Sequence, residues 1–296
     1  MSSGQSQVTT ESRSRQARYI SAAVGIPIGL GVCIFSPVLF NLLVIALVTI
    51  GVAEFYAMAR HRGLSPHSII GASCSIVICF LAWFGSPLNI LYGLVASIII
   101  VFIFAMMRNT RDALTNISVT VFGIFYVGWL TSHVILLRQL TLGPGVTRFN
   151  LGGAGYVIML LILLWLDDGG AFFAGTSWGK HKLVPAISPN KTVEGSVGGI
   201  IMTLVGAVLL KEVGIVLKCF GVDMFPQVSY FTYLLIGLGT AIAGQVGDLC
   251  ESYLKRDAGL KDTGNLLPGH GGFLDRFDSL IFTAPLFYYY LKLANF

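Results

Sequence analysis

The sequence is poor in charged residues: aspartate, glutamate, lysine and arginine make up only 11% of its 296 residues. Soluble globular domains carry roughly 25%. Hydrophobic residues instead reach 55%, and apolar runs of about 20 residues, the length that crosses a bilayer core, recur along the chain. Because helices satisfy their own backbone hydrogen bonds in lipid, the composition excludes a soluble enzyme and predicts an all-α, polytopic integral membrane protein.

Signatures of metal clusters, disulfide frameworks and P-loops are also missing. The five cysteines form no CxxC pair and no zinc spacing with histidine, so they predict neither disulfides nor a zinc site. The segment GTSWGKH at 175–181 approaches a P-loop, but three residues separate its glycines where four are required, and no Ser or Thr follows the lysine. Any nucleotide chemistry must therefore use another arrangement.

About nine apolar segments are predicted to span the membrane as helices. They cover residues 19–36, 38–59, 68–85, 88–107, 115–137, 153–176, 196–217, 229–252 and 276–294. The polar residues 1–18 predict a disordered cytoplasmic tail. We expect 19–137 to form a transmembrane scaffold of five helices and 153–296 to form a catalytic transmembrane region of four.

Lysine and arginine are distributed unevenly between the two sides of this arrangement. With the N-terminus in the cytoplasm, 14 of the 19 lie on the cytoplasmic side. The five outside are Arg138, Arg148, Lys211, Lys218 and Lys292. Since cytoplasmic loops carry an excess of these residues, the count favours this orientation and explains the net charge of +5 without nucleic acid. The loops 177–195 and 253–277 then both face the cytoplasm, where nucleotides are found.

Acidic residues are scarce in the first half of the chain. Only Glu11, Glu54 and Asp112 precede residue 160, whereas eleven follow it. Glu54 lies near the inner end of the second predicted helix, and we interpret it as a carboxylate that snorkels to the interface or pairs with Arg60. Helices 1–5 are therefore expected to be scaffold, and the chemistry is expected in the second half.

Two adjacent carboxylates, Asp167 and Asp168, lie above the cytoplasmic end of the sixth predicted helix. Neighbouring helical residues point about 100° apart, so Asp168 shares a stripe with Phe172 and Gly175, and Asp167 points elsewhere. A carboxylate at bilayer depth usually faces a bundle interior or a water cavity. Asp168 is therefore a candidate site residue; the alternative is a structural pair with a lysine.

The segment HKLVPAISPNKTVEG, residues 181–195, contains two prolines that exclude a continuous helix, so we predict a loop. Ser188, Asn190 or Thr192 can cap the helix that follows. Lys191 then lies near a helix N-terminus, which favours an anion over a cation. Lys191 is predicted to meet an anionic ligand there, or else to be a solvated loop lysine.

Carboxylates recur on the last two predicted helices. Asp248, Ser252 and Lys255 follow at i, i+4 and i+7 on one face, and Asp275 and Asp278 begin the final helix at i and i+3. A single pair could be simple helix-start acids favoured by the helix dipole. Several carboxylates around one mouth repel one another, and a hard divalent cation with oxygen ligands relieves that repulsion.

Positive charge and glycine lie between these acids. The 27 residues from 252 to 278 hold eight charged side chains, and the cations Lys255, Arg256 and Lys261 are suited to phosphate. The stretch LLPGHGGF at 266–273 allows the backbone to approach a phosphate closely. Carboxylates for metal, cations for phosphate and a glycine turn together indicate phosphoryl or nucleotidyl transfer.

The pattern S-x-L-K-R-x4-K-D-x-G-x2-L-P-G-H-G-G-x-L-D-R-x-D, from Ser252 to Asp278, resembles the signature of the phosphatidate cytidylyltransferases, or CDP-diacylglycerol synthases. SPNKTVEG at 188–195 and DxGAxFxGxxxGKHKL from Asp168 are also similar to that family. The resemblance is specific over roughly 160–296. It implies that CTP and phosphatidic acid give CDP-diacylglycerol and pyrophosphate, with Mg2+.

The resemblance also implies roles for residues. Asp248, Asp275 and Asp278 would be metal ligands or their support, and Asp275, Asp248 and Lys255 the catalytic set. Lys191, Lys255, Arg256 and Lys261 would hold phosphates, while Ser188, Asp168, His270 and Arg276 would line the site. The acids leave room for a second cation, divalent or monovalent such as K+. The expected state is a homodimer in a bacterial plasma membrane, with small-xxx-small patterns such as Gly25–Gly29 and Gly195–Gly199 permitting close helix contacts.

Two other functions compete with this hypothesis. A membrane lipid kinase that uses CTP shares the phosphate chemistry but releases CDP in place of pyrophosphate. A cation transporter also uses intramembrane acids, but it predicts carboxylates in mid-span without clustered cations. The acids here lie toward one membrane face beside lysines and arginines, which favours the transferase.

Overall fold

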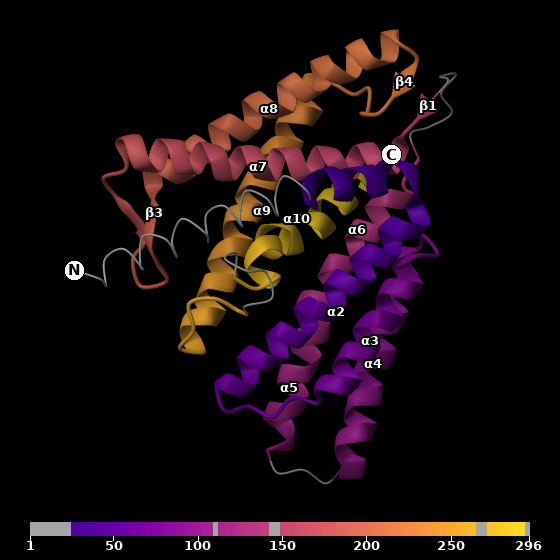
Figure 1. The fold of residues 1–296 in the computed structure, drawn as a ribbon, viewed down its shortest axis with the longest axis vertical. Coiled ribbons are helices and arrows are strands. Elements are labelled where there is room, and N and C mark those ends of the chain that lie inside the picture. Colours follow the sequence, from indigo (N-terminus) through magenta and orange to yellow (C-terminus); the bar gives the residue numbers. More distant parts are fainter. Residues whose placement is uncertain (1–24, 109–111, 142–148, 265–270, 294–296) are drawn as a thin grey trace, which may run out of the picture.

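The computed structural model describes residues 25–108, 112–141, 149–264 and 271–293 (Figure 1). Within these ranges the chain is almost entirely helical, which confirms the all-α prediction. The helices are α2 Pro37–His61, α3 Ser68–Ala82, α4 Pro87–Arg108, α5 Ala113–Gly123, the π-helix η1 Ile124–Trp129, α6 Leu130–Gln139, α7 Gly152–Trp178, α8 Val193–Cys219, α9 Tyr230–Asp257 and α10 Leu274–Leu293. A further helix covers Gly25–Phe35.

Each predicted span overlaps one of these helices, or a continuous run of them. Six spans are long and apolar enough to cross a membrane: α2, α4, Ala113–Gln139 (which joins α5, η1 and α6), α7, α8 and α9. Gly25–Phe35 and α3 are shorter apolar helices, and α10 is helical where the ninth span was predicted. The chain is a multi-pass membrane protein, and nine crossings remain a prediction.

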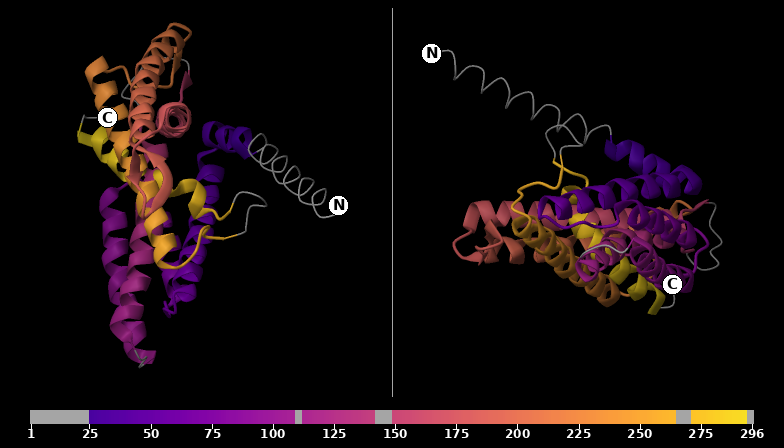
Figure 2. Two further views of the ribbon diagram at one scale, coloured as in Figure 1. Left: turned by 90° about the vertical axis from the view of Figure 1, so that its left-hand side faces the viewer. Right: turned by 90° about the horizontal axis from the view of Figure 1, so that it is seen from below.

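The helices form two parts that meet near the middle of the molecule. In Figure 1 the helices α2 to α6 run together as a bundle, and α7 crosses its upper end. Figure 2 shows the same relation from the side, where α7 is seen nearly end-on while the bundle stays upright. The helices α8 and α9 pack beside α7, and α10 lies between α9 and the bundle.

Glycines allow α7 and α8 to approach closely. A Cβ added at Gly170 would lie 2.8 Å from the carbonyl oxygen of Gly198, and one at Gly199 would lie 2.9 Å from the carbonyl oxygen of Asp167. The glycines of α8 therefore serve contacts within the chain. The helix α7 also continues through Gly169 and Gly170 without a break.

Contacts between loops at one end join segments that were predicted to share the cytoplasmic side. Arg256 Nε donates to the carbonyl of Ile187 at 3.4 Å, which ties the end of α9 to the 181–195 segment. His61 Nδ1 lies 2.9 Å from the carbonyl oxygen of Ala258. The loop after α2, the loop before α8 and the loop after α9 therefore lie at one end of the molecule.

The opposite end joins segments predicted to be outside. The two-residue strands β1 (Phe149–Asn150) and β4 (Val222–Asp223) pair in parallel. Arg138 Nε donates to the carbonyl of Cys33 at 2.7 Å. The described loop contacts thus sort into the two sets that the charge distribution predicted, although these contacts do not reveal which set is cytoplasmic.

The 181–195 segment contains more structure than the loop that was expected. Its strands β2 (Lys182–Val184) and β3 (Ser188–Thr192) form an antiparallel hairpin. Proline is tolerated here because each strand of a two-stranded sheet has a free edge. Of the three predicted caps, Thr192 is the residue that caps α8: its Oγ1 accepts from the Gly195 amide at 3.1 Å.

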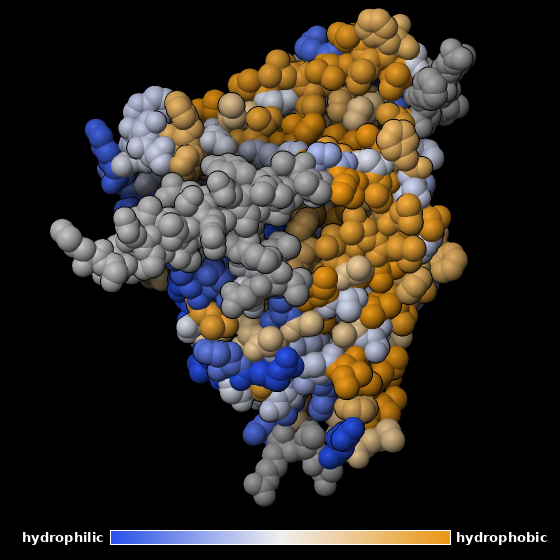
Figure 3. All heavy atoms as spheres, in the orientation of Figure 1, coloured by the Kyte–Doolittle hydropathy of each residue, from blue (hydrophilic) through white to orange (hydrophobic). Residues whose placement is uncertain are grey.

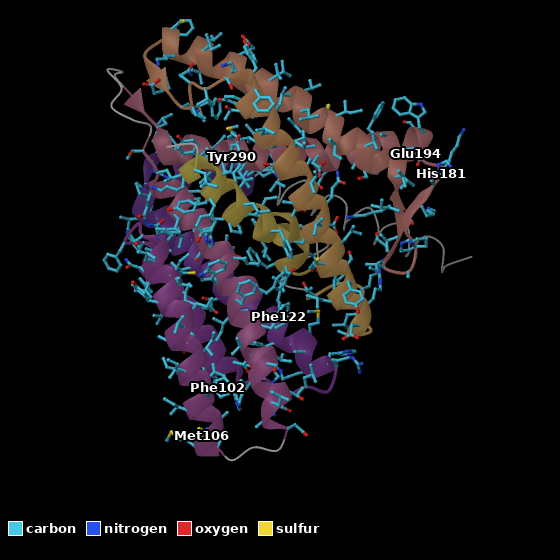
Figure 4. All side chains as sticks on the ribbon, turned by 180° about the vertical axis from the view of Figure 1, so that it is seen from behind. Phe102, Met106, Phe122, His181, Glu194 and Tyr290 are labelled. Atoms are coloured by element: carbon cyan, nitrogen blue, oxygen red, sulfur yellow. The ribbon has the colours of Figure 1, made fainter. Side chains whose placement is uncertain are left out.

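Large apolar side chains cover much of the outer surface. Figure 3 shows hydrophobic residues over the upper and right-hand parts of one face, with hydrophilic residues along the lower left. On α4, Phe102 and Met106 project outward (Figure 4), and Met106 is 78% exposed. Such a surface is suited to lipid and agrees with a multi-pass membrane protein.

Candidate functional site

A cavity of about 570 Å3 lies between α7, α8, α9, the start of α10 and the hairpin. Its polar or charged lining residues are Asp167, Asp168, Thr176, Asn190, Lys191, Thr192, Ser196, Gln245, Asp248 and Ser279. Ala171, Phe172, Gly175, Leu183 and Gly195 complete the wall. This is the size of a small-molecule site, and it gathers polar groups from segments far apart in the sequence.

Both carboxylates of α7 line this cavity. Asp168 is exposed, and it shares the cavity wall with Phe172 and Gly175, the stripe that helical spacing predicted. Asp167 was expected to point elsewhere, but it is only 3% exposed and accepts a hydrogen bond from Gln245 Nε2 at 2.9 Å. The cavity follows α7 toward α8 and α9, so neighbouring side chains reach it from two directions.

Lys191 and Asp248 form an ion pair within the cavity. Lys191 belongs to β3 and Asp248 to α9, and their side chains are 28% and 29% exposed, so both remain accessible to a ligand. Ser252 Oγ also donates to Asp248 Oδ1 at 3.4 Å. The structure therefore brings together a loop lysine and a helix carboxylate that sequence analysis assigned to one site.

Asp278 adds a third carboxylate beside this pair. It comes from the first turns of α10, and it lies close enough to Asp168 and Asp248 for the charges to repel one another. Its Oδ1 accepts from the Ser279 amide at 2.6 Å. Lys191 and Arg276 attract Asp168, so positive charge partly balances the cluster.

Asp275 is engaged with the protein itself. Its Oδ1 accepts from Lys255 Nζ at 2.7 Å, and its Oδ2 accepts from the Thr263 amide at 2.8 Å, Thr263 Oγ1 at 3.0 Å and the Gly272 amide at 2.8 Å. Burial by itself raises the pKa of Asp275, but hydrogen bonds from Lys255, Thr263 and Gly272 hold that pKa below its usual value. These contacts make Asp275 an anchor for the segment that precedes α10.

Lys255 was predicted to face a phosphate, but in the structure it is buried between two carboxylates. It pairs with Asp275 and with Glu251, and Glu251 is only 1% exposed. Sequence analysis missed Glu251, although its i, i+4 spacing to Lys255 is the usual signal for an ion pair on a helix. A buried cation between two acids stabilises the junction of α9 and α10.

The other predicted phosphate ligands lie farther out. Arg256 is exposed and donates to the backbone carbonyls of Ile187 and Leu260, and Lys261 is also exposed. Ser188 lies at the start of β3 and does not line the cavity. His270 lies outside the described residues. The predicted group of three cations is therefore divided between an internal ion pair and the surface.

Glu54 makes contacts that differ from both of its interpretations. Arg60 Nη1 donates to Ser68 Oγ at 2.6 Å, whereas Glu54 accepts from the Phe273 and Leu274 amides, each at 2.9 Å. A buried carboxylate needs donors, and the first amides of α10 have no partner within their own helix. The prediction of an interfacial or Arg60-paired Glu54 was therefore wrong.

A further pair lies where the hairpin meets α8. His181 Nδ1 is 2.6 Å from Glu194 Oε1, and the His181 amide also donates to this carboxylate (Figure 4). Glu194 is the acidic residue in the first turn of α8, a position that the helix dipole favours. This pair fixes the hairpin that carries Lys191.

The donor chemistry of the cavity fits a hard cation. Asp168 and Asp248 line the cavity, and Asp278 is close enough to both for their charges to repel one another. Carboxylate oxygens are the ligand type that Mg2+ prefers. No group of three or more His, Cys, Asp or Glu side chains in the described part of the chain is already arranged to hold a metal. Mg2+ commonly binds through one or two carboxylates together with substrate phosphates, and the cavity meets that requirement.

Comparisons with known proteins give one family. The sequence profile of the Cytidylyltransferase family matches residues 16–294. A phosphatidate cytidylyltransferase of Synechocystis is 32% identical over 298 aligned positions, covering 93% of this chain and 96% of the relative. One of Staphylococcus epidermidis is 32% identical over 273 positions, covering 92% and 96%. One of Bacillus subtilis is 42% identical over 170 positions, which span 57% of this chain and 56% of the relative.

Proposed function

The chain belongs to the cytidylyltransferase family, and we propose that it is a phosphatidate cytidylyltransferase with its active site in the Lys191–Asp248 cavity. It transfers the cytidylyl group of CTP to phosphatidic acid and releases pyrophosphate, a step of phospholipid biosynthesis. The observation that carries this assignment is the cavity itself, which Lys191, Asp248 and Asp168 line together, with Asp278 close enough to both carboxylates to be repelled by them.

The protein's part in this reaction is to bring two polyanions together. A phosphate monoester has a second pKa near 6, so phosphatidate is mostly dianionic at neutral pH and needs no protein base. A lipid phosphate oxygen bonds to the α-phosphorus of CTP as the bond to the β-phosphate breaks, and pyrophosphate leaves with the bonding electrons. Lys191 supplies positive charge for the phosphates, while Ser196 and Gln245 supply polar contacts.

Mg2+ is the cofactor of this proposal. Asp248 and Asp278 would hold it with the substrate phosphates, and Asp168 and Asp167 leave carboxylates for a second cation. When bound, Mg2+ supplies charge neutralisation for the triphosphate. Asp275 was predicted as a third ligand; its four hydrogen bonds support a positioning role for it.

The lipid is proposed to enter sideways from the bilayer. Phe172 forms part of the cavity wall and is 74% exposed, and Phe173 and Trp178 are exposed farther along α7. These aromatic side chains are suited to acyl chains beside a polar phosphate site. The side concerned is the cytoplasmic face of a bacterial plasma membrane, which the Lys and Arg count supports.

The central test measures products. Purified protein is given labelled CTP and phosphatidate with Mg2+ or with EDTA. The expected result is pyrophosphate and a lipid-soluble cytidine product, formed only with Mg2+. CDP without pyrophosphate would identify a lipid kinase. If no group is transferred from CTP to the lipid, the assignment is refuted.

Sidedness has its own test. In a background without native cysteines, one cysteine is placed in 181–195 and another in 253–264, and both are treated with an impermeant thiol reagent in oriented vesicles. The Arg256–Ile187 contact predicts that both positions are accessible from the same side. The Lys and Arg count predicts that this side is the cytoplasmic one. Labelling of the two positions from opposite sides would contradict a single site.

A homodimer is also part of the proposal. A Cβ added at Gly25 or Gly29 would meet nothing within 4 Å, so this face of the first helix is open to a second copy. The Gly195–Gly199 pattern instead packs on α7 within the chain. Light scattering in detergent should give twice the protein mass for the natural chain, and the monomer mass would refute the dimer.

A further inference from the structure

Glu54 is the only acidic residue that α2 contributes, and it lies against the segment that leads into α10. It is 9% exposed. Its Oε1 accepts from the Phe273 amide and its Oε2 from the Leu274 amide, each at 2.9 Å, and Thr263 Oγ1 donates to Oε2 at 3.3 Å. One carboxylate of the scaffold therefore binds both ends of the chain between Thr263 and Leu274.

Two glycines that flank residues 265–270 lie close to Glu54. A Cβ added at Gly264 would lie 2.9 Å from Glu54 Oε1, and one at Gly272 would lie 2.7 Å from Oε2, so a side chain at either position would displace the carboxylate. One turn earlier on α2, a Cβ at Gly51 would come within 3.0 Å of the Phe273 ring. The surface of α2 at Gly51 and Glu54 is thus a seat for the start of α10.

Thr263 connects this seat to the catalytic half. Its amide donates to Asp275 Oδ2 at 2.8 Å, and its single hydroxyl proton can be donated either to Glu54 Oε2 or to Asp275 Oδ2, which lie at 3.3 and 3.0 Å. Asp275 in turn binds Lys255, which also pairs with Glu251 of α9. A continuous polar network therefore runs from α2 through Thr263 to α10 and α9.

The position of α10 determines where Asp278 points. Asp278 lies one turn after Asp275 and next to Ser279, which lines the cavity, and it is close enough to Asp168 and Asp248 for their charges to repel one another. Moving the first turn of α10 would move this carboxylate relative to the other two. Catalytic geometry is sensitive at this scale, because misplacement by about 1 Å can cost about 100-fold in rate.

We propose that Glu54 is a positioning residue of the enzyme, through which the scaffold half fixes the start of α10 and the carboxylates that face the cavity. Glu54 is not among the residues that line the cavity. The inference rests on the proposed function, since it assigns a role within that reaction, and it gives the helices before residue 140 a part in catalysis that their apolar sequence does not indicate.

The first test is Glu54→Gln. The amide keeps the size of the side chain, but its Nε2 group must face either the Phe273 amide or the Leu274 amide and Thr263, which are donors. We expect kcat to fall about 10- to 100-fold, the loss that corresponds to a charge-assisted hydrogen bond. The KM for CTP should change less than about threefold, because Lys191 and the other cavity residues are intact.

Two further readouts separate positioning from a general loss of stability. The Mg2+ concentration that gives half-maximal activity should rise, and the amides of Phe273 and Leu274 should exchange hydrogen faster even without substrate. Val48→Ala is the control, because it removes buried apolar groups from the same helix. It is expected to lower the melting temperature without changing either readout.

A matched pair at Thr263 covers the case in which Glu54→Gln does not fold. Thr263→Val keeps the shape and removes the bridging hydroxyl, whereas Thr263→Ser keeps the hydroxyl. We expect valine to lower kcat about tenfold and serine to restore it. Wild-type kcat and Mg2+ dependence in both Glu54→Gln and Thr263→Val would overturn the inference. A wild-type chain that forms no cytidine lipid would instead refute the proposed function, and the amide exchange would still test the Glu54 seat.

Discussion

Asp275→Asn distinguishes an anchor from a metal ligand. In the structure Asp275 Oδ1 binds Lys255 and Oδ2 accepts three donors from Thr263 and Gly272. An asparagine can present its oxygen to only one of these sets. Its NH2 group then faces either the Lys255 ammonium or the three donors of Thr263 and Gly272. In both cases two hydrogen-bond donors face each other and no hydrogen bond forms.

The magnitude follows from these contacts. A hydrogen bond to a charged group contributes about 1.5–3 kcal/mol, and stranding a buried charge costs about 3–5 kcal/mol. Lys255 keeps Glu251 as a partner in the variant, so the full cost of stranding a buried charge does not apply. We expect a loss of about 2–3 kcal/mol, or about 5–10 °C in melting temperature for a chain of this size.

The assay is thermal unfolding in detergent with EDTA, so that no metal contributes. Asp278→Asn is the matched control: it removes a carboxylate that Asp248 and Asp168 repel, so its melting temperature should stay level or rise while activity falls at least about 100-fold. If Asp275→Asn melts like the wild type in EDTA yet is inactive, the anchoring argument fails and metal ligation explains the loss.

The stability difference should also depend on pH. The pKa of Asp275 is lowered in the folded protein, chiefly because hydrogen bonds outweigh its burial. A lowered pKa gives stability that is complete above the unfolded value of about 3.9 and is lost as the pH falls through the folded value. The gap between wild type and Asp275→Asn should therefore persist from neutral pH to about 5 and close in stronger acid.

Two other substitutions test the cavity and its walls. Lys191→Ala should raise the KM for CTP about 10- to 100-fold because it removes a charge that binds phosphate; Lys182→Ala, on the exposed neighbouring strand, should leave that KM unchanged, and equal effects would show that Lys191 has no special role. Gly170→Ala should lower the melting temperature by several degrees, since its Cβ would lie 2.6 Å from Met202 Cβ and 2.8 Å from the Gly198 oxygen. Gly169→Ala meets nothing within 4 Å and should have no such effect, so equal melting of the two variants would contradict the α7–α8 packing.

Much of the fold is predictable from the sequence because lipid restricts what a chain can do. Apolar runs must become helices, and every predicted span overlaps a described helix or helical run. Helix ends were less certain: the predicted span 115–137 contains the π-helix Ile124–Trp129, for which the apolar pattern offered no signal. The 181–195 hairpin was also missed. Its prolines argue against a strand that has a hydrogen-bonded neighbour on both sides, but both strands of this hairpin are edge strands.

The site was predictable in composition but only partly in arrangement. Helical spacing put Asp168, Phe172 and Gly175 on one stripe, and all three line the cavity. The charge count put Lys191 on the same side as Asp248, with which it pairs. Spacing along one helix does not show which side chain of another helix a residue will contact. Lys255 was therefore predicted to bind a phosphate, whereas the structure places it between Glu251 and Asp275. Glu54 was missed for the same reason, since its partners lie more than 200 residues away in the sequence.

The charges near the end of the chain therefore divide by task. Lys255 pairs with both Glu251 and Asp275 inside the protein, so its positive charge is already used by two carboxylates. Lys191, the lysine that lines the cavity, lies on a hairpin outside the 252–278 signature, and it is the cation that the proposed function assigns to phosphate. A low-dielectric surrounding makes an unpaired charge costly and a paired one rigid, so the internal triad holds α9 against α10 while Lys191 and Asp248, each partly exposed, stay free to exchange their mutual contact for a ligand.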